Sequence, residues 1–299
     1  MLHLLNGDAT LAVFPSTLPG DRAVWRDIMV EGPPVDDGPV RAGWLAARLG
    51  VSSDEYERGW HEGQALLARA GRDELVLWFE QDLFCAVNLW FIVARLPPTT
   101  PLWLIFPPLG DSFAGLGAST PAELAGLFET RRRLDGDAWS EAGRLWQAYA
   151  TSDPTGLAGR RRALVFADEA VRLHLGRFPS VSNGLNEIET ATLDALVKGP
   201  QRFGDLFRTV THAPAHRRHG MGDVQYANVL RELRPLIALE GDATPYSGWR
   251  VALTRDGSDV LEGRVDGLAA RPLDRWLGGV HVQPGQRSWR WDGVRLVRP

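Results

Sequence analysis

The sequence predicts an α/β fold: an open parallel sheet in an N-terminal domain, a helical connector, and a C-terminal winged helix-turn-helix with a β-hairpin tail. In the first half, short apolar runs alternate with segments of helical periodicity, which is typical of parallel strands joined by helical crossovers. In the second half, three helical segments precede two apolar strands, which is the order of a winged helix. We therefore expect an α/β domain at 1–135, a helical connector at 136–180, a winged-helix-like domain at 181–263 and a hairpin tail at 264–299.

Four apolar segments are expected to form the N-terminal sheet. The third, 74–79, is almost continuously apolar, as a strand buried on both faces of a sheet is. Each segment ends at residues that favour a turn or carry a charge. The four segments are 1–5, 22–30, 74–79 and 101–106.

Capping signals predict the helices between these strands. Ser52 lies three residues before Glu55, which is the spacing of a capping box, and opens one helix. Thr120 and Glu123 repeat the spacing around a proline at the first helical position. Segment 81–94 has helical spacing directly after a strand, so the order strand, helix, strand implies right-handed parallel crossovers.

The C-terminal part is expected to begin after a linker at 179–184, which is rich in Pro, Ser, Asn and Gly. Asn186 and Glu189 have capping-box spacing and open its first helix. Strand alternation around Pro284 and Gly285 predicts the hairpin tail. The remaining expected elements are helical stretches at 138–177, 203–210 and 223–233 and strands at 236–239 and 249–253.

Composition limits the class of protein. The chain has 299 residues, of which 44% are hydrophobic, and a net charge of −4, so neither a disordered chain nor a general polyanion binder is expected. The single cysteine, Cys85, excludes a disulfide framework and a zinc site built from cysteines. No apolar run reaches the ~18 residues that span a bilayer, and the N-terminal residues lack the charged start of a signal peptide. We expect a cytoplasmic protein with no membrane partner.

Several motifs together resemble a known family. Residues 3–8 read His-Leu-Leu-Asn-Gly-Asp, 25–27 read Trp-Arg-Asp, 31–33 read Glu-Gly-Pro, and 78–84 read Trp-Phe-Glu-Gln-Asp-Leu-Phe. They resemble the bacterial family known as domain of unknown function 1835 over roughly the first half of the chain. Gly-Asp at 222–223 and Trp-Arg-Trp-Asp at 289–292 resemble longer members of that family. The resemblance implies the domain layout and the choice of motifs, and it implies no activity.

Polar side chains follow the ends of the first three expected strands. Because ligands bind outside the carboxyl ends of parallel strands, these side chains are expected to meet at one edge of the sheet. Clustered carboxylates raise one another's pKa, which indicates a bound cation, a cationic ligand or acid–base chemistry. The candidate catalytic residues are Asp8 and Glu80, as general base or metal ligand, and Asp27, as an orienting partner. The candidate ligand-binding residues are His3, Asn6, Gly7, Glu31 and Asp82.

The cofactor is left open by the sequence. Glu80 and Asp82 are ligands of the kind that Mg²⁺ prefers, so Mg²⁺ is one alternative. Asp82 also begins a helix, where a capping role alone would account for it. Gly115 and Gly117, ahead of Thr120, weakly resemble a phosphate loop but lack its third glycine and its lysine.

Two other motifs are expected to carry no chemistry. His212, His216 and His219 have a spacing that would suit zinc on a helix, but Pro214 interrupts the stretch, so no zinc is expected. Cys85 lies in an apolar helix and is expected to be a small buried side chain rather than a nucleophile.

The charge of the expected winged helix bears on DNA binding. Residues 185–262 carry nine basic and eleven acidic side chains, a net charge of −2. Because phosphate neutralisation supplies most non-specific affinity, this balance disfavours DNA as a partner. We expect an enzyme, or an enzyme-like binder, that takes a small polar metabolite bearing a phosphate or an amine at the carboxylate-lined edge, with the winged helix as an accessory module. The alternative is a one-component transcriptional regulator that senses a ligand through its α/β domain.

The tail is expected to dock onto the rest of the protein. Residues 263–299 have a net charge of +4, and strand alternation places Trp289 and Trp291 on one face. Large aromatic side chains that share a face are usually buried, and a lone hairpin is only marginally stable. The acidic first domain is the expected electrostatic partner of the tail.

Overall fold

The computed structural model describes residues 1–70, 74–108, 114–159, 163–164, 166–241 and 245–298. The chain divides into two compact units, Met1–Ala170 and Val171–Pro299. The division lies inside a helix, α7 (Ala167–Leu175), which is part of the expected connector. Among the described residues, no helix is both long enough and apolar enough to cross a lipid bilayer.

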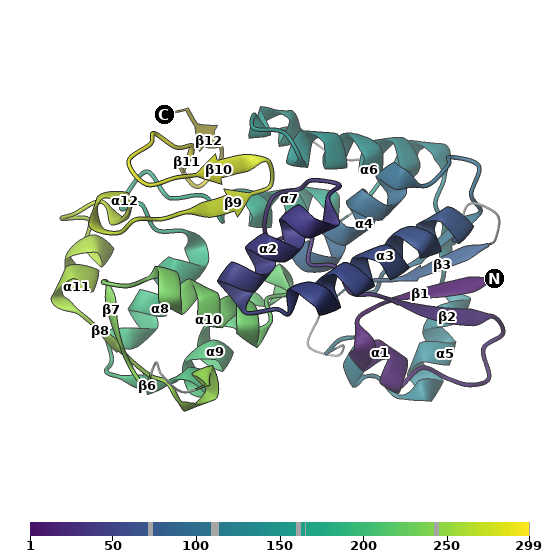
Figure 1. The fold of residues 1–299 in the computed structure, drawn as a ribbon, viewed down its shortest axis with the longest axis horizontal. Helices are drawn as coiled ribbons and strands as arrows, with labels where there is room; N and C mark the ends of the chain where they lie inside the picture. Colours follow the sequence, from purple (N-terminus) through teal and green to yellow (C-terminus); the bar gives the residue numbers. More distant parts are fainter. Residues whose placement is uncertain (71–73, 109–113, 160–162, 165, 242–244, 299) are drawn as a thin grey trace. The chain divides into compact units, whose positions relative to one another are not determined.

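The first unit is built on a five-stranded sheet (Figure 1). Its strands are β1 (Leu2–Asn6), β2 (Asp21–Trp25), β3 (Leu75–Trp78), β4 (Leu102–Ile105) and β5 (Arg132–Arg133). The order is β2-β1-β3-β4-β5, and the first four strands are parallel while β5 runs antiparallel to β4. The expected open parallel sheet is therefore confirmed, with one antiparallel edge strand in addition.

Strand β2 is shorter than the expected segment 22–30. It ends at Trp25, and the chain then turns. The backbone carbonyls of Ile28, Glu31 and Pro33 accept hydrogen bonds from the side chain of Arg41. The apolar content of 22–30 therefore predicts too long a strand. Beyond Trp25, backbone carbonyls accept hydrogen bonds from the distant Arg41 and not from a neighbouring strand.

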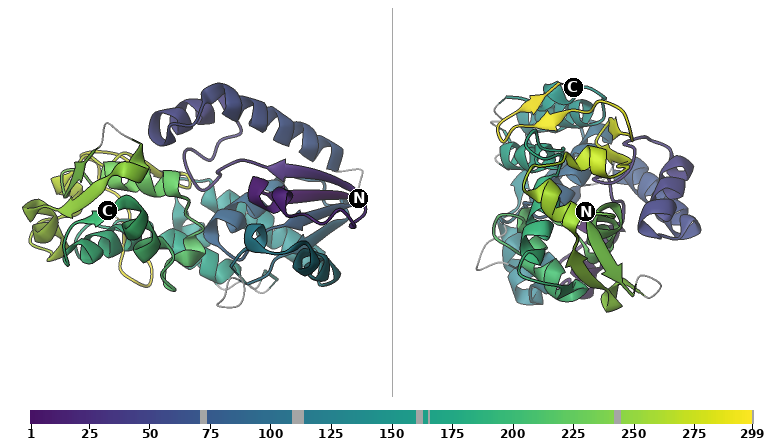
Figure 2. Two further views of the ribbon diagram at one scale, coloured as in Figure 1. Left: turned by 90° about the horizontal axis from the view of Figure 1, so that it is seen from below. Right: turned by 90° about the vertical axis from the view of Figure 1, so that its left-hand side faces the viewer.

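Helices cover both faces of the sheet. They are α1 (Asp8–Ala12), α2 (Gly38–Leu49), α3 (Ser53–Ala70), α4 (Leu83–Arg95), α5 (Pro121–Glu129) and α6 (Gly136–Tyr149), with 3-10 turns at Leu116–Ala118 and Pro154–Leu157. Helices α1 and α5 lie on one face, and α3 and α4 lie on the other (Figure 1). The 18-residue helix α3 runs along the strands, as Figure 2 shows. Helix α6 packs on α4, where the Trp146 ring meets the Phe91 ring edge-on with centroids 4.9 Å apart.

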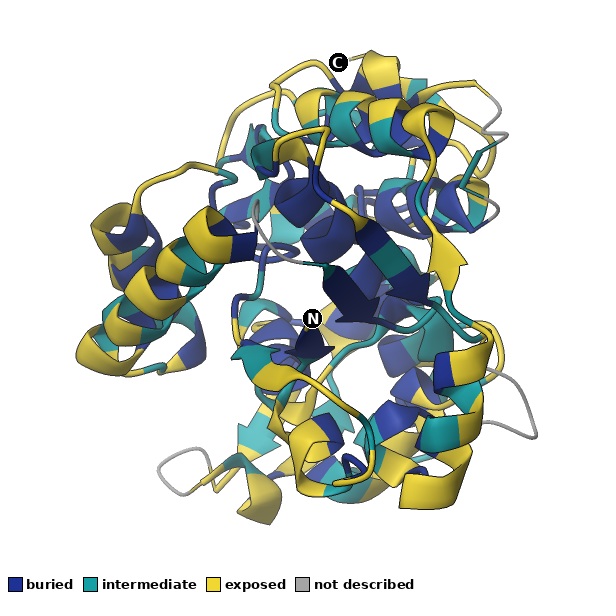
Figure 3. Cartoon of the chain, turned by 90° about the vertical axis from the view of Figure 1, so that its right-hand side faces the viewer, coloured by how far each residue is buried: buried dark blue, intermediate teal, exposed yellow. Residues whose placement is uncertain are grey.

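Side chains of β3 alternate between the two faces. Val76 and Trp78 pack into the cluster that includes Phe128 of α5, and the Trp78 and Phe128 rings stack with centroids 6.3 Å apart. Figure 3 shows the central strands of this unit, β1, β3 and β4, mostly in the colour of buried residues, between helices whose outer sides are exposed. Each large apolar side chain buried in this way contributes about 1.5–3 kcal/mol.

The alternation continues beyond the end of β3. Phe79 N–H donates to Ile105 O and Gln81 N–H donates to Pro107 O, so the chain stays paired with the segment after β4. Because alternate residues of an extended chain point to opposite faces, Glu80 follows Trp78 onto the α5 face and Gln81 points to the α4 face.

The second unit combines helices with a small antiparallel sheet. After α7 come α8 (Glu187–Leu196), β6 (Gln201–Arg202), α9 (Phe203–Thr211), α10 (Asp223–Glu232), β7 (Ile237–Glu240), β8 (Arg250–Leu253), α11 (Arg255–Leu261) and α12 (Gly267–Ala270), with 3-10 turns at Arg217–His219 and Tyr246–Gly248. The sheet order is β6-β8-β7, with both pairs antiparallel. Asn186 and Glu189 form the expected capping box at the start of α8. Phe203, Tyr226 and Trp249 lie together in the core of this unit.

The tail forms two short antiparallel pairs. Its strands are β9 (Arg275–Leu277), β10 (Val280–Val282), β11 (Arg290–Trp291) and β12 (Leu296–Val297). β9 pairs with β10 and β11 with β12, so the expectation of one hairpin centred on Pro284 and Gly285 is wrong. The first turn falls at Gly278 and Gly279, because Gly278 adopts a φ of 59°, which the two-residue turns of hairpins require.

The tail packs inside the second unit. Phe178, Leu277 and Trp291 share one apolar cluster. The Trp291 N–H donates to Pro179 O at 2.8 Å, and Val181 N–H donates to Trp291 O at 2.9 Å. The expected docking of the tail is confirmed within this unit.

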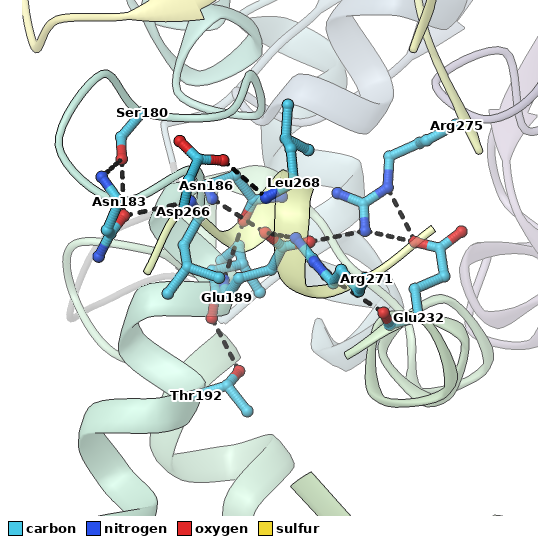
Figure 4. Close-up of polar contacts among 12 residues, drawn as sticks. Ser180, Asn183, Asn186, Glu189, Thr192, Glu232, Asp266, Leu268, Arg271 and Arg275 are labelled. Carbon is cyan, nitrogen blue, oxygen red and sulfur yellow. Dashed lines mark hydrogen bonds and ion pairs between the residues drawn. The ribbon is translucent and has the colours of Figure 1, made fainter. Parts of the chain in front are cut away.

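A buried ionic cluster joins the start of the tail to α8 and α10 (Figure 4). Arg271 Nη2 donates to Glu189 Oε2 at 2.6 Å, and Arg275 Nη2 donates to Glu189 Oε1 at 2.8 Å. Arg275 Nε also donates to Glu232 Oε2 at 2.9 Å. Although burial raises the pKa of Glu189, the charges of Arg271 and Arg275 lower it to about 2 overall. The acidic partners of these arginines thus belong to the second unit, whereas the sequence had pointed to the first domain.

Candidate functional site

The strand order places a topological switch point between β1 and β3. The chain leaves β1 on one side, to form β2, and returns on the other side, to form β3. Open α/β sheets bind ligands at the carboxyl ends of strands that part in this way. Leu5 pairs with Trp78, so Asn6 at the end of β1 lies beside the segment that carries Glu80 and Asp82. The structure therefore brings these three sequence-predicted residues to one edge of the sheet.

A buried hydrogen-bond network joins this edge to α4. Asn6 Nδ2 donates to Cys85 Sγ at 2.9 Å, and Asn88 Nδ2 donates to Asn6 Oδ1 at 3.2 Å and to Asp27 O at 3.1 Å. Met29 N–H donates to Asn88 Oδ1 at 3.3 Å. Asn88 is not among the residues predicted from the sequence. The signal was present, because an amide inside an otherwise apolar helix must find partners when it is buried.

Glu80 is held against the segment that precedes α5. Its Oε1 accepts the Leu116 N–H at 2.6 Å. A Cβ on Gly115 would lie 3.2 Å from this Oε1, and the Gly115 φ of 129° also requires glycine. Burial raises the pKa of Glu80, and the hydrogen bond from Leu116 opposes that shift. Of the two glycines that weakly resembled a phosphate loop, Gly115 thus allows close approach to a carboxylate, and Gly117 allows close approach to Ala9.

Asp82 caps α4 and is buried. Its Oδ1 accepts the Cys85 N–H at 2.6 Å, which confirms the expected capping role. Burial raises the pKa of Asp82 to about 7, and the charge of Glu80 contributes to this rise. Burial also raises the pKa of the Cys85 thiol, so Cys85 is a protonated, buried side chain at neutral pH, as expected.

Asp27 lies in a buried ion pair. Arg41 Nη2 donates to Asp27 Oδ1 at 2.8 Å, and Tyr56 OH donates to the same oxygen at 2.9 Å. Arg41 is fully buried, and its N–H groups find acceptors on Asp27, Tyr56 and the three carbonyls named above. The side chain of Asp27 thus fixes the turn after β2, while its carbonyl oxygen supports Asn88 at the site.

Asp8 lies outside the network of described contacts around Asn6. Arg26 Nη2 donates to Asp8 Oδ1 at 2.7 Å, and Arg26 Nε donates to Asp8 Oδ2 at 3.0 Å. Both side chains are exposed. The hydrogen bond from Arg26 lowers the pKa of Asp8, so this carboxylate is ionised. Of the three candidate catalytic residues, only Glu80 has a half-buried carboxyl at the switch point in the described structure.

The other predicted ligand-binding residues have structural surroundings. His3 is buried, its Nδ1 accepts the Trp78 Nε1–H at 3.0 Å, and its Nε2 therefore carries the proton donated to Pro19 O at 2.8 Å. Burial lowers the pKa of His3, so the ring is neutral. Gly7 joins β1 to α1 with a φ of 104°. Glu31 is buried, and its carbonyl accepts from Arg41.

The described residues contain no group of three or more His, Cys, Asp or Glu side chains placed to hold a metal ion. His219 is buried, and burial lowers its pKa to about 3. Glu80 and Asp82 remain two carboxylates at one edge. A Mg²⁺ ion there would complete its octahedral shell with water or with substrate oxygens.

Comparison of the chain with protein-family models, with curated proteins and with solved structures found no match.

Proposed function

We propose that the first unit binds a small polar metabolite at the carboxyl ends of β1 and β3, and that Glu80 and Asp82 carry out acid–base chemistry on it. The observation that carries this proposal is a pair of carboxyl groups, two residues apart, at the switch point of the sheet. Burial raises the pKa of both groups, and that of Asp82 reaches about 7. Carboxyl groups whose pKa values are raised at a strand edge are typical of general acids and bases.

The two carboxyl groups have different roles in this proposal. Glu80 is half-buried and is the group that would contact the ligand, whereas Asp82 is enclosed by the start of α4. The charge of Glu80 disfavours ionisation of Asp82, so Asp82 is the group that holds a proton while Glu80 is ionised. An amine, or a phosphate that carries Mg²⁺, would relieve the repulsion between them.

Thermal-shift measurements with a panel of amines and of phosphate esters, each with and without Mg²⁺, test the proposal. We expect members of one class to raise the melting temperature of the wild type by several degrees at neutral pH. Glu80→Gln should abolish this stabilisation and still accept the Leu116 N–H. Asp8→Asn is the matched control, because Asp8 follows the neighbouring strand end but pairs with Arg26 in solvent.

The outcome also separates the two ligand chemistries. Stabilisation by amines alone assigns a cationic ligand, and stabilisation by phosphate esters that requires Mg²⁺ assigns a metal-bound ligand. Ligands that stabilise the wild type and Glu80→Gln equally would overturn the proposed site. The same conclusion holds if Asp8→Asn removes the effect as fully as Glu80→Gln does.

We further propose that the second unit is a winged-helix-like accessory module, and that the resemblance to domain of unknown function 1835 reflects a shared layout. The order α8, β6, α9, α10, β7, β8 supports a winged helix. Glu232, at the end of the third helix, is bound by Arg275, and Gln225 Oε1 accepts the Gly222 N–H. These contacts and the net charge of −2 over 185–262 favour an accessory role over the alternative of a DNA-reading regulator.

A further inference from the structure

We propose that a cavity on the α4 face of the first unit binds an organic anion with an apolar body. The cavity has a volume of about 530 Å³, within the range of roughly 300–1,000 Å³ that small-molecule sites occupy. Its floor is apolar, with Leu89 and Trp90 from α4 and Leu104 and Phe106 from β4 and the segment that follows it.

The wall opposite this floor is held by specific contacts. Glu141 Oε2 of α6 accepts the Ala163 N–H at 2.9 Å and the Leu164 N–H at 2.8 Å. Phe166 closes the same wall and meets Phe106 edge-on, with ring centroids 5.8 Å apart. The cavity is thus lined by side chains and backbone whose positions are fixed by hydrogen bonds and ring packing.

The rim of the cavity carries the cationic side chain of Arg132. This residue of β5 is exposed, and its guanidinium has no hydrogen-bond or ionic partner among the described residues. Arg132 is paired with Leu104 of the floor, and residues opposite each other in an antiparallel pair point to the same face. The acidic residue in the lining is Asp135, whose Oδ1 already accepts the Ala138 N–H at 2.8 Å.

This cavity is separate from the site of Glu80. Gln81 lines the cavity, and its Nε2 donates to Phe106 O at 2.8 Å. Glu80 points to the opposite face of the sheet and contacts Leu116. The inference therefore does not depend on the proposed function, and each can fail while the other holds.

The chemistry of the lining defines the ligand class. An unpartnered guanidinium such as that of Arg132 binds carboxylates through charge-assisted hydrogen bonds. The aromatic and aliphatic floor favours a body without polar groups, because a buried polar group without a partner costs about 1–3 kcal/mol. A carboxylate with an aryl or alkyl body satisfies both parts of the cavity.

Isothermal titration calorimetry with three probes tests the inference. The probes are 4-phenylbutyrate, its neutral primary amide, and inorganic phosphate, which has the charge without the body. We expect 4-phenylbutyrate to bind at least tenfold more tightly than either of the others. Arg132→Gln should remove most of the difference in affinity between 4-phenylbutyrate and its amide. Arg144→Gln is the matched control, because Arg144 is an exposed arginine of α6 that does not line the cavity.

A second pair of variants tests the apolar part. Ala86→Met adds volume at the floor and should weaken binding of 4-phenylbutyrate at least fivefold. If Ala86→Met fails to fold, Thr130→Trp blocks the cavity from an exposed position. Equal affinity for 4-phenylbutyrate and its amide would show that the cavity does not select an anion. Equal affinity for 4-phenylbutyrate and inorganic phosphate would show that the apolar floor does not contribute to binding. The inference as a whole would be overturned if 4-phenylbutyrate showed no measurable binding at millimolar concentration. It would also be overturned if Arg144→Gln lowered the affinity for 4-phenylbutyrate as much as Arg132→Gln does.

Discussion

The guanidinium of Arg41 and the carboxylate of Asp27 form an ion pair inside the first unit, with 2.8 Å between Nη2 and Oδ1. Their side chains are 0% and 6% exposed. The pair holds the turn after β2 against α2, and it places the Asp27 carbonyl where Asn88 can donate to it. A residue predicted to act in catalysis thus supports the candidate site through its backbone.

Arg41→Leu should destabilise the protein strongly. Removing one partner of a buried ion pair leaves the other charge uncompensated, which costs about 3–5 kcal/mol. Asp8→Asn breaks an exposed pair instead, and it should cost about 0–1 kcal/mol. Urea denaturation of both variants measures the difference. Similar free energies of unfolding for the two would contradict the structural role of Arg41.

The site could be predicted in part because strand ends are visible in the sequence. Asn6, Glu80 and Asp82 follow apolar segments, and parallel pairing brings such ends together. The partner of Asp27 could not be found in this way. Arg41 lies fourteen residues further along, on a helix with no periodic link to the turn, and only the folded chain brings the two together.

Asp82→Asn should change how stability depends on pH. Burial raises the pKa of Asp82 from 3.8 to about 7, so the folded state retains a proton that the unfolded state has lost between these values. Stability of the wild type should therefore fall as pH rises from about 4 to 7, by up to roughly 4 kcal/mol, and stay level above that range. Asparagine still caps the helix but does not titrate.

Denaturant midpoints of the wild type and Asp82→Asn, measured between about pH 4 and pH 8, check this prediction. The midpoint of Asp82→Asn should exceed that of the wild type by an amount that grows as the pH rises across that range. In a Glu80→Gln background, the difference between the midpoints with Asp82 and with Asn at position 82 should be smaller, because the charge of Glu80 contributes to the raised pKa of Asp82. Parallel profiles for wild type and Asp82→Asn would show that Asp82 titrates at its ordinary pKa.

The fold was easier to predict in the first unit than in the tail. Apolar runs marked β1, β3 and β4, because strands of a parallel sheet are buried on both faces. In the tail, the turn at Gly278 and Gly279 was not predicted, because Gly-Gly and Pro-Gly are both turn signals and the sequence does not rank the pair at 278–279 against the pair at 284–285. Register in such short strands depends on the apolar cluster around Phe178, which sequence spacing does not reveal.

Glu189→Gln should remove acid sensitivity from the second unit. The charges of Arg271 and Arg275 overcome the effect of burial and lower the pKa of Glu189 from 4.5 to about 2. Stability from this group is present above about pH 4.5 and is lost as pH falls toward 2, a change of roughly 3 kcal/mol. Urea unfolding across this range, with the exposed Glu240→Gln as control, measures it. If the free energy of unfolding of Glu189→Gln fell with acid as steeply as that of the wild type, the lowered pKa of Glu189 would be contradicted.

Binding to double-stranded DNA should be weak and independent of sequence. The net charge of −2 over 185–262 leaves few cations to displace counterions. Fluorescence anisotropy with random and genomic fragments should show binding at about 50 mM salt at most, and none at 200 mM. A preferred fragment bound at 200 mM salt would favour the regulator over the accessory module.

Trp291→Ala should destabilise the second unit far more than Trp289→Ala. Trp291 is buried at 7% exposure in the cluster with Phe178 and Leu277, and its backbone bonds to Pro179. Truncating a buried tryptophan to alanine costs about 3–5 kcal/mol, because it removes transfer energy and leaves a cavity. Trp289 packs on the edge of the same cluster and is only half-buried, so its loss should cost much less.

Thermal melts of both variants and limited trypsin digestion check the difference. The Trp291 variant should become sensitive at Arg275, which is buried in the wild type. Equal melting temperatures and equal resistance at Arg275 would show that the tail is not anchored through Trp291.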